Sequence, residues 1–196
     1  YFEKILQAEV YEVAKKTPLE KAHNLSNTLK NDIFLKREDL QDVFSFKVRG
    51  AYNKMSKLTN SQLAQGVITS SAGNHAQGVA LSALKLNCQA TILMPITTPL
   101  VKVNAVKNLK AKVILFGDNY DETYKEAIRI SQERNLCFIH PFDDPDVIAG
   151  QGTIAIEIEQ QLKDKPYAIY IAVGGGGLIS GISLYIKKIW PEVKII

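Results

Sequence analysis

The run of four glycines from Gly174 to Gly177 constrains the fold more than any other feature of the sequence. An apolar segment ends at Val173, and apolar residues at helical spacing follow from Leu178 onward. Glycine disfavours the interior of both strands and helices, so the run predicts a turn between the two. Backbone N–H groups in such a turn can surround an anion, assisted by the positive end of the following helix. The alternative is a tight turn whose glycines only permit close packing.

The spacing of these glycines does not match two common nucleotide-binding motifs. A dinucleotide fingerprint needs a glycine at the sixth place, which here is Ile179 or Ser180 depending on where the count begins. A P-loop ends in a glycine, a lysine and a hydroxyl residue, and no lysine follows the run. We therefore expect the anion to be a compact phosphate monoester.

Short β-branched segments alternate with helical patterns along the whole chain. The expected strands are 33–36, 66–69, 90–94, 112–116, 137–140, 167–173 and 193–196. The expected helices are 7–14, 47–58, 74–86, 100–109, 120–134, 153–163 and 178–189. Apolar strands separated by helices indicate a parallel sheet that is covered on both faces. The predicted fold class is therefore α/β.

The chain is expected to form two domains. Residues 57–143 contain strand–helix units in regular order and would form a small α/β domain. The segments 1–56 and 144–196 would together form a larger domain. The acidic segment 143–146 would be a crossing point, with a hinge at Gly150 and Gly152. The alternative, which we favour for this segment on sequence alone, is a plain loop followed by a helix start.

Composition excludes several classes of function. Hydrophobic residues make up 46% of the chain and charged residues 22%, as in ordinary globular proteins. The net charge of +4 comes from dispersed lysines, so we expect no nucleic-acid partner. Cys88 and Cys137 lack metal-ligand or redox spacing, which favours no metal and a reducing, cytoplasmic setting. The uncharged stretch 168–186 is long enough to suggest a membrane span, but its central glycines argue against one.

Lys47 is the strongest candidate nucleophile. It lies where a helix is expected to begin, with Phe44 and Phe46 as apolar surroundings and Arg49 as a nearby cation. Both influences lower the pKa of an amine and make it more nucleophilic. Taken alone, a lysine in this setting is far more often a solvated charge. Combined with an anion-binding turn, it predicts pyridoxal phosphate bound through a Schiff base to Lys47.

A second turn, Ser71 to His75, follows the expected strand 66–69. Backbone N–H groups and small hydroxyls at a helix start suit a carboxylate, as an amino-acid substrate would present. Asn74 could donate to a ring oxygen of the cofactor. The alternative is a simple N-cap formed by Ser71 or Asn74. We assign no catalytic role to His75 or His140.

Together these motifs resemble the fold-type-II pyridoxal phosphate enzymes, and within them the biosynthetic threonine ammonia-lyases (threonine dehydratases). The resemblance covers essentially the whole chain. Its motifs are Thr17-Pro18-Leu19, Lys36-Arg37-Glu38-Asp39, Ser45 to Ala51, Ser71 to Gly78, Ile148 to Thr153, and Val173 to Leu178. The resemblance implies a tryptophan-synthase-β-like fold of two parallel-sheet α/β domains, with the large domain incomplete at its C-terminal end.

The resemblance also implies a role for each site residue. Lys47 would bind the cofactor and act as the base at the α-carbon of the substrate. Phe46 would pack against the cofactor ring, and Asn74 would contact its 3-hydroxyl oxygen. The substrate carboxylate would be bound by the first turn, Ser71, Ala72, Gly73, Asn74 and His75. The cofactor phosphate would be bound by the glycine run and the residue after it, Gly174, Gly175, Gly176, Gly177 and Leu178. The implied reaction converts L-threonine, and L-serine by analogy, to a 2-oxoacid and ammonia, and with threonine it is the first step of isoleucine biosynthesis.

Other interpretations remain open. Serine racemases resemble this chain, but they usually have a second serine where this sequence has Ala72, which favours a lyase. The chain begins at Tyr1 without a methionine and ends within the expected strand 193–196, so we expect a fragment of a longer protein. A non-catalytic fragment that only binds phosphate or cofactor is therefore the rival hypothesis. By resemblance, the full-length protein would form dimers or tetramers.

Overall fold

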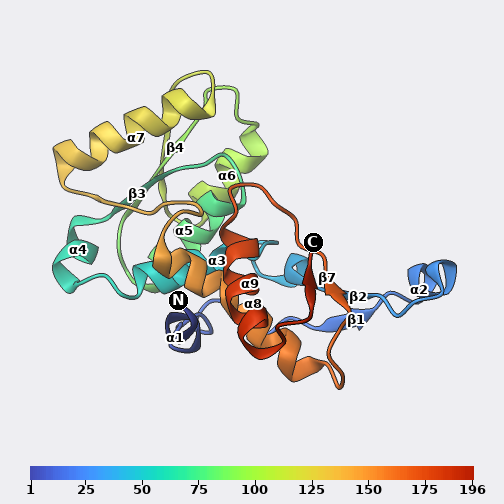
Figure 1. Ribbon diagram of the computed structural model, residues 1–196. Helices are drawn as coiled ribbons and strands as arrows, with labels where there is room; N and C mark the ends of the chain where they lie inside the picture. Colours follow the sequence, from blue (N-terminus) through green and yellow to red (C-terminus); the bar gives the residue numbers. More distant parts are fainter.

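A computed structural model describes residues 1–196, and its main sheet contains four parallel strands in the order β5-β4-β3-β6 (Figure 1). These strands are β3 (Val67–Ser70), β4 (Ala90–Met94), β5 (Lys112–Leu115) and β6 (Cys137–Phe138). The helices are α1 (Phe2–Leu6), α2 (His23–Leu29), α3 (Lys47–Met55), α4 (Asn60–Gln65), α5 (Asn74–Lys85), α6 (Leu100–Asn108), α7 (Tyr120–Arg134), α8 (Pro145–Gln161) and α9 (Gly177–Ile189). The predicted α/β class with a parallel sheet is confirmed.

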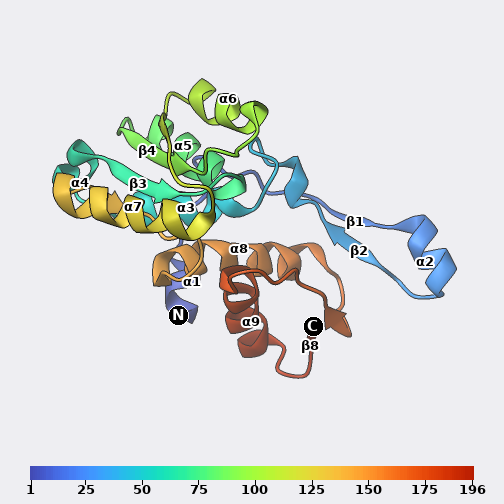
Figure 2. The same cartoon turned by 90° about the horizontal axis from the view of Figure 1, so that it is seen from above.

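Side chains of the main sheet alternate between two apolar cores. Ile92 and Met94 of β4 pack in a core with α3, α5 and α6. Leu93, between them in the sequence, packs on the other face with Ala127 and Ile130 of α7. Figure 2 shows α7 and α6 on opposite sides of these strands. Strand β4 thus alternates at period two yet is apolar on both faces, as a covered parallel sheet requires.

Helix α8 packs against both α3 and α9, and glycines lie where these helices cross. A Cβ atom on Gly150 would lie 2.6 Å from the carbonyl oxygen of Arg49 and 2.7 Å from the Cα of Gly50. On the other side of α8, a Cβ atom on Gly181 would lie 2.7 Å from the backbone nitrogen of Gly152. The backbones of these helices therefore touch without intervening side chains.

The segment after residue 143 forms a short loop and the start of a helix. Helix α8 begins at Pro145, and the Asp144 side chain caps it by accepting from Asp146 N at 2.8 Å and Val147 N at 3.1 Å. Gly150 and Gly152 lie inside this helix, so the expected hinge at these glycines is wrong, whereas the division of the chain into two domains at this segment stays a prediction. The observed helix α8 begins eight residues before the start of the expected helix 153–163.

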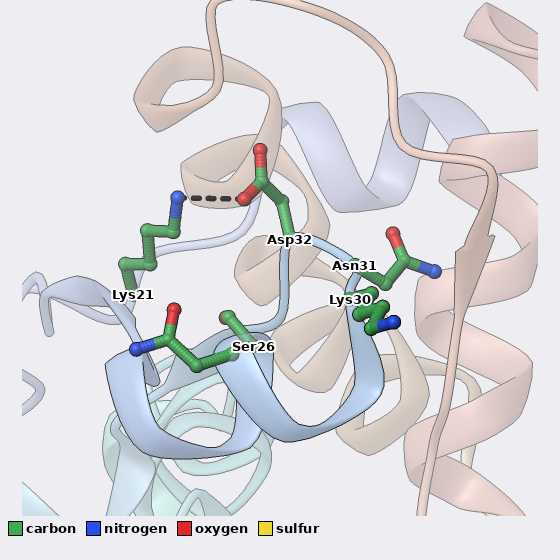
Figure 3. A pocket seen from close by; sticks show the side chains of 6 residues that line it. Lys21, Ser26, Lys30, Asn31 and Asp32 are labelled. Carbon is green, nitrogen blue, oxygen red and sulfur yellow. Dashed lines mark ion pairs between the residues drawn. The ribbon is translucent and has the colours of Figure 1, made fainter.

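A separate arm extends from the body of the protein (Figures 1 and 2). It consists of β1 (Leu19–Lys21) and β2 (Phe34–Lys36), which pair antiparallel, with α2 at the tip. An open polar cavity of ≈ 570 Å³ lies at the tip, where Lys21 and Asp32 form an ion pair at 2.6 Å (Figure 3). The cavity lies far from α3, and no sequence motif pointed to it.

The expected helix over residues 7–14 is wrong, because this segment consists of turns and irregular backbone. Val10 and Ala14 are buried against other apolar side chains, which produced the helix-like spacing in the sequence. The backbone N–H of Glu9 donates to the side chain of Asn53 at 3.0 Å instead of to a helical carbonyl. Within this segment, backbone bonds of helical type are confined to one turn, in which the N–H groups of Val13 and Ala14 donate to the Val10 carbonyl.

Several short elements lie outside the expected set, namely α1, α2, α4 and β1. Of these, α4 has a sequence signature, since Thr59 and Gln62 form a capping box. The strand expected at 167–173 is confined to β7 (Ala168–Ile169), which pairs in parallel with β8 (Lys194–Ile195). None of the helices combines the length and the apolar character that crossing a bilayer requires.

Candidate active site

Lys47 is the first residue of α3, and its side chain is half-buried. Its Nζ donates to the carbonyl oxygen of Pro141 at 2.7 Å and lies 5.5 Å from the centre of the Phe46 ring. Its backbone is pressed against α5, because a Cβ atom on Gly78 would lie 3.1 Å from the Lys47 carbonyl carbon and oxygen. Burial lowers the pKa of the Lys47 amine, so a larger share of it is unprotonated and nucleophilic than in a solvated lysine.

The residues expected to shield Lys47 behave differently from one another. Phe46 is half-buried and packs against the core formed by α8 and α9. Phe44 is 74% exposed and has a φ of 56°, so the expectation that it surrounds Lys47 is wrong. Arg49, expected to act as a nearby cation, instead points into a separate buried cluster. Burial alone accounts for the lowered pKa of Lys47.

That buried cluster joins α3 to α8 and to the base of the arm. The Arg49 guanidinium pairs with Glu157 at 2.6 Å and with Glu38 at 2.8 Å, and neither Arg49 nor Glu157 has any exposed surface. Lys36 also donates to Glu157, at 2.6 Å. Burial opposes ionisation of Glu157, but hydrogen bonds from Arg49 and Lys36 outweigh it and lower the pKa of this carboxyl. The motif residues Lys36 and Glu38 are thus structural partners of Arg49.

The turn from Ser71 to His75 connects β3 to α5. Gly73 is the N-cap of α5 and no side chain caps the helix, so the simple N-cap interpretation of Ser71 or Asn74 is wrong. Ser71 Oγ instead accepts from the backbone N–H of Gly73 at 3.2 Å. Asn74 is exposed and makes no side-chain hydrogen bond within the chain, and nothing lies within 4 Å of the space beside Gly73. Backbone N–H groups and the Asn74 amide are therefore open to a ligand.

His75, the last residue of this turn, is buried, with 3% of its surface exposed. Its Nε2 lies 3.1 Å from the carbonyl oxygen of Ile139. A carbonyl only accepts, so Nε2 carries the hydrogen and Nδ1 is a bare acceptor, which is buried without a partner. Burial lowers the pKa of His75 to about 3. His75 is therefore neutral near pH 7 and offers no positive charge to a carboxylate.

The glycine run forms the turn before α9, as expected. Gly176 has a φ of 89°, which few other residues adopt, and is the N-cap of this helix. Nothing lies within 4 Å of the space beside Gly174 or Gly176, whereas Gly175 and Gly177 are covered by Phe142. The N–H groups of Gly177 and Leu178 begin the helix and have no carbonyl partner within it. The Leu178 side chain packs into the neighbouring core.

The segment Ile139 to Phe142 links the three predicted motifs. The Ile139 carbonyl lies 3.1 Å from His75 Nε2, and the Pro141 carbonyl accepts from Lys47 Nζ at 2.7 Å. The last residue of the segment, Phe142, packs against the glycine turn. Ligands of parallel sheets bind at the carboxyl ends of strands, and this segment directly follows β6. Pro141 and Phe142 belong to none of the predicted motifs, and their position directly after an expected strand is the one sequence signal that points to them.

These observations fit pyridoxal phosphate. Lys47 supplies an amine with a lowered pKa, as condensation with an aldehyde requires. The turn beside Gly174 and Gly176 is open and lies at the start of a 13-residue helix, as a phosphate requires. The Ile139 to Phe142 segment connects the amine to the turn.

The chain is similar to characterised enzymes over its whole length. A family model described as "Pyridoxal-phosphate dependent enzyme" matches residues 10–196. The "Threonine dehydratase biosynthetic, chloroplastic" of Arabidopsis thaliana is 59% identical over 100% of this chain and 33% of that protein. The processed threonine deaminase isoform 2 of Solanum lycopersicum superposes with a TM-score of 0.96 at 53% identity, covering 100% of this chain and 53% of that one. Maize serine racemase superposes with a TM-score of 0.95 at 32% identity, covering 99% of this chain and 59% of that one. The chain spans about a third of the length of the curated relatives it matches.

Proposed function

The chain belongs to the family of pyridoxal-phosphate dependent enzymes, and from that premise we propose that the full-length protein is a biosynthetic threonine ammonia-lyase. It would convert L-threonine to 2-oxobutanoate and ammonia, and would accept L-serine as well. The observation that carries the proposal is the half-buried Lys47 amine, bound to a segment that also packs against an open glycine turn. Identity above 50% to proteins named threonine dehydratase supports the choice of substrate.

Each part of the site has a role in this reaction. The bound cofactor would supply an electron sink for the negative charge that develops at the α-carbon. The Lys47 Nζ would remove the α-proton, which its lowered pKa favours at neutral pH. Backbone N–H groups from Gly174 to Leu178 would bind the phosphate. Those from Ser71 to His75 would bind the substrate carboxylate and hold the α-C–H bond toward Lys47.

The side chains of Phe46 and Asn74 would complete the cofactor site. Phe46 lies beside the Lys47 amine, where its ring can orient an aromatic aldehyde. Asn74 has a free amide that can donate to the 3-hydroxyl oxygen. The net reaction breaks the α-C–H, β-C–O and C–N bonds, and the water lost from the β-carbon equals the water consumed in releasing ammonia. No external oxidant or reductant is needed.

A racemase is the second candidate, because the chain superposes closely on maize serine racemase. Ala72 supports the lyase, since a racemase needs a proton donor on the face opposite Lys47 and alanine has no acidic proton. Incubation of the full-length protein with L-serine distinguishes the two activities. We expect pyruvate and ammonia, whereas accumulation of D-serine would favour the racemase.

We also propose the division into residues 1–56 with 144–196, and residues 57–143. It is supported by the main sheet, whose strands all lie between Val67 and Phe138, and by the separate packing of α8 and α9. A cytoplasmic location is supported by the two free cysteines, Cys88 and Cys137. Assembly of the full-length protein into dimers or tetramers completes the proposal and is testable by light scattering.

The decisive experiment compares the full-length protein with its Lys47→Arg variant. We expect the wild-type protein to produce 2-oxobutanoate from L-threonine and the variant to produce none, because arginine stays protonated. Borohydride reduction followed by peptide mass spectrometry should locate the cofactor on Lys47. Undiminished 2-oxobutanoate production by Lys47→Arg would overturn the proposal, as would a cofactor found on another lysine.

A further inference from the structure

His140 closes a tight turn at the end of β6. Its Nδ1 accepts from two backbone N–H groups, that of Asp143 at 2.8 Å and that of Phe142 at 3.3 Å. One imidazole nitrogen therefore holds the backbone of three successive residues in place. The ring is fixed in turn by aromatic neighbours, with the Phe142 ring 4.8 Å away and the Tyr124 ring 6.3 Å away, both nearly perpendicular to it.

This turn bears the contacts that connect the two ends of the cofactor site. Pro141, inside the turn, accepts from Lys47 Nζ at 2.7 Å. Phe142, the next residue, covers Gly175, and its carbonyl oxygen would lie 2.8 Å from a Cβ atom on Gly177. If the turn opened, both the Lys47 amine and the glycine turn would lose a fixed neighbour at once.

We propose that His140 is a positioning residue, whose Nδ1 holds the 140–143 turn so that Lys47 and the glycine turn keep the spacing that a phosphorylated aldehyde needs. It touches neither the substrate nor the reacting atoms. The inference depends on one part of the proposed function, the binding of the cofactor at Lys47.

The role requires a neutral imidazole with a bare Nδ1, because a protonated Nδ1 cannot accept from an N–H. The charged or titratable groups near His140 are Lys47 on α3, His75 on α5, Tyr124 on α7, and Asp143 and Asp144 in its own segment. Burial lowers the pKa of His140 and Lys47 lowers it further, while the two aspartates oppose this shift. The neutral form is thus favoured near pH 7.

Two substitutions distinguish the contribution of the Nδ1 acceptor from that of the aromatic ring. His140→Asn keeps an acceptor oxygen at about the reach of Nδ1, whereas His140→Phe keeps an aromatic ring and removes the acceptor. His140→Leu serves in place of His140→Phe if the phenylalanine variant does not fold. His23→Phe, at an exposed histidine on the arm, is the matched control. All are made in the full-length protein.

The measurement is the dissociation constant for pyridoxal phosphate, obtained by absorbance titration, together with the thermal midpoint of each variant. We expect His140→Phe to weaken binding about tenfold or more, since the loss of hydrogen bonds that fix a site typically costs this much. His140→Asn should stay within about threefold of wild type, and His23→Phe should not change. The affinity for pyridoxal phosphate should fall as the pH is lowered, and in His140→Asn this fall should begin at a lower pH, because an amide does not titrate.

Wild-type affinity in His140→Phe would overturn the inference, because the ring alone would then suffice. Equal weakening in His140→Asn and His140→Phe would also overturn it, because the acceptor would not matter. The titration does not depend on turnover. A wild-type protein that binds the cofactor on Lys47 but leaves L-threonine unchanged would refute the proposed activity while still testing His140.

Discussion

The Phe142 ring occupies the space that a Cβ atom on Gly175 would need, whereas nothing lies within 4 Å of the corresponding space beside Gly174. Two adjacent glycines of one turn therefore face different surroundings. The Cβ position of Gly175 points at the Phe142 ring, and that of Gly174 points into the space where we place the phosphate. The two positions can be separated by experiment.

We expect Gly174→Ala to weaken pyridoxal phosphate binding about tenfold or more, because the added methyl group enters the anion site. Its thermal midpoint should match that of wild type, since no protein atom is displaced. Gly175→Ala should lower the unfolding free energy by about 1–3 kcal/mol, because the methyl group meets the Phe142 ring. Cofactor titration and thermal denaturation measure both effects. Unchanged cofactor affinity in Gly174→Ala would exclude this turn as the phosphate site.

A second prediction concerns the crossing of α3 and α8. Alanine favours helices over glycine, yet we expect Gly150→Ala to destabilise the protein by about 1–3 kcal/mol, because its Cβ would meet the backbone of Arg49 and Gly50. Gln160→Ala, at an exposed position of the same helix, is the control and should have little effect. Urea denaturation of both variants gives the comparison. A stabilised Gly150→Ala protein would show that the helices separate easily.

A third prediction concerns the buried ion cluster. Arg49→Met should lower the unfolding free energy by about 3–5 kcal/mol, because it leaves Glu157 and Glu38 charged without their main partner. Arg37→Met, which removes an exposed guanidinium paired with Glu20 and Asp39, should change stability little. Equilibrium unfolding in urea measures the difference. Equal effects at the two arginines would mean that burial adds nothing to the Arg49 pairs.

A fourth prediction concerns acid stability. The pKa of His75 is lowered from 6.5 to about 3 in the folded protein, and the pKa of His140 is also lowered, in both cases because of burial. The unfolded chain thus binds more protons below pH 6.5, so stability should fall as pH drops from 6.5 toward 3. Each histidine contributes a slope of at most about 1.4 kcal/mol per pH unit.

His75→Gln provides the control for this pH effect, because its amide can still donate to the Ile139 carbonyl but does not titrate. The measurement is the unfolding free energy from pH 7 to pH 4. The variant should lose stability less steeply than wild type over this range. An identical slope in the two proteins would show that His75 is not the titrating group.

Sequence patterns predicted the elements that are apolar and regular, and missed those that depend on distant partners. The strand at 90–94 was placed correctly, because a continuous apolar segment between turns has few alternatives. The start of α8 was placed too late because Gly150 and Gly152 disfavour a helix locally, although in the fold they permit helices to cross. The helix over 7–14 was wrong because burial of Val10 and Ala14 imitated helical periodicity.

The candidate site divides in the same way. Lys47 and the glycine run could be found in the sequence, because an amine and a side-chain-free turn have chemistry that is visible residue by residue. The contribution of Pro141 could not, because it acts through a backbone carbonyl that every residue possesses. His140 has a recognisable side chain, but its importance comes from two N–H groups that only the folded turn brings to it.

The contact between Gly50 and Gly150 also determines which parts of the protein can move. With no side chains between them, α3 and α8 cannot slide or tilt without their backbones colliding, so the Lys47 amine travels with α8 as one rigid piece. A movement that separates α3 from α8 is therefore an unfavourable way of opening the site.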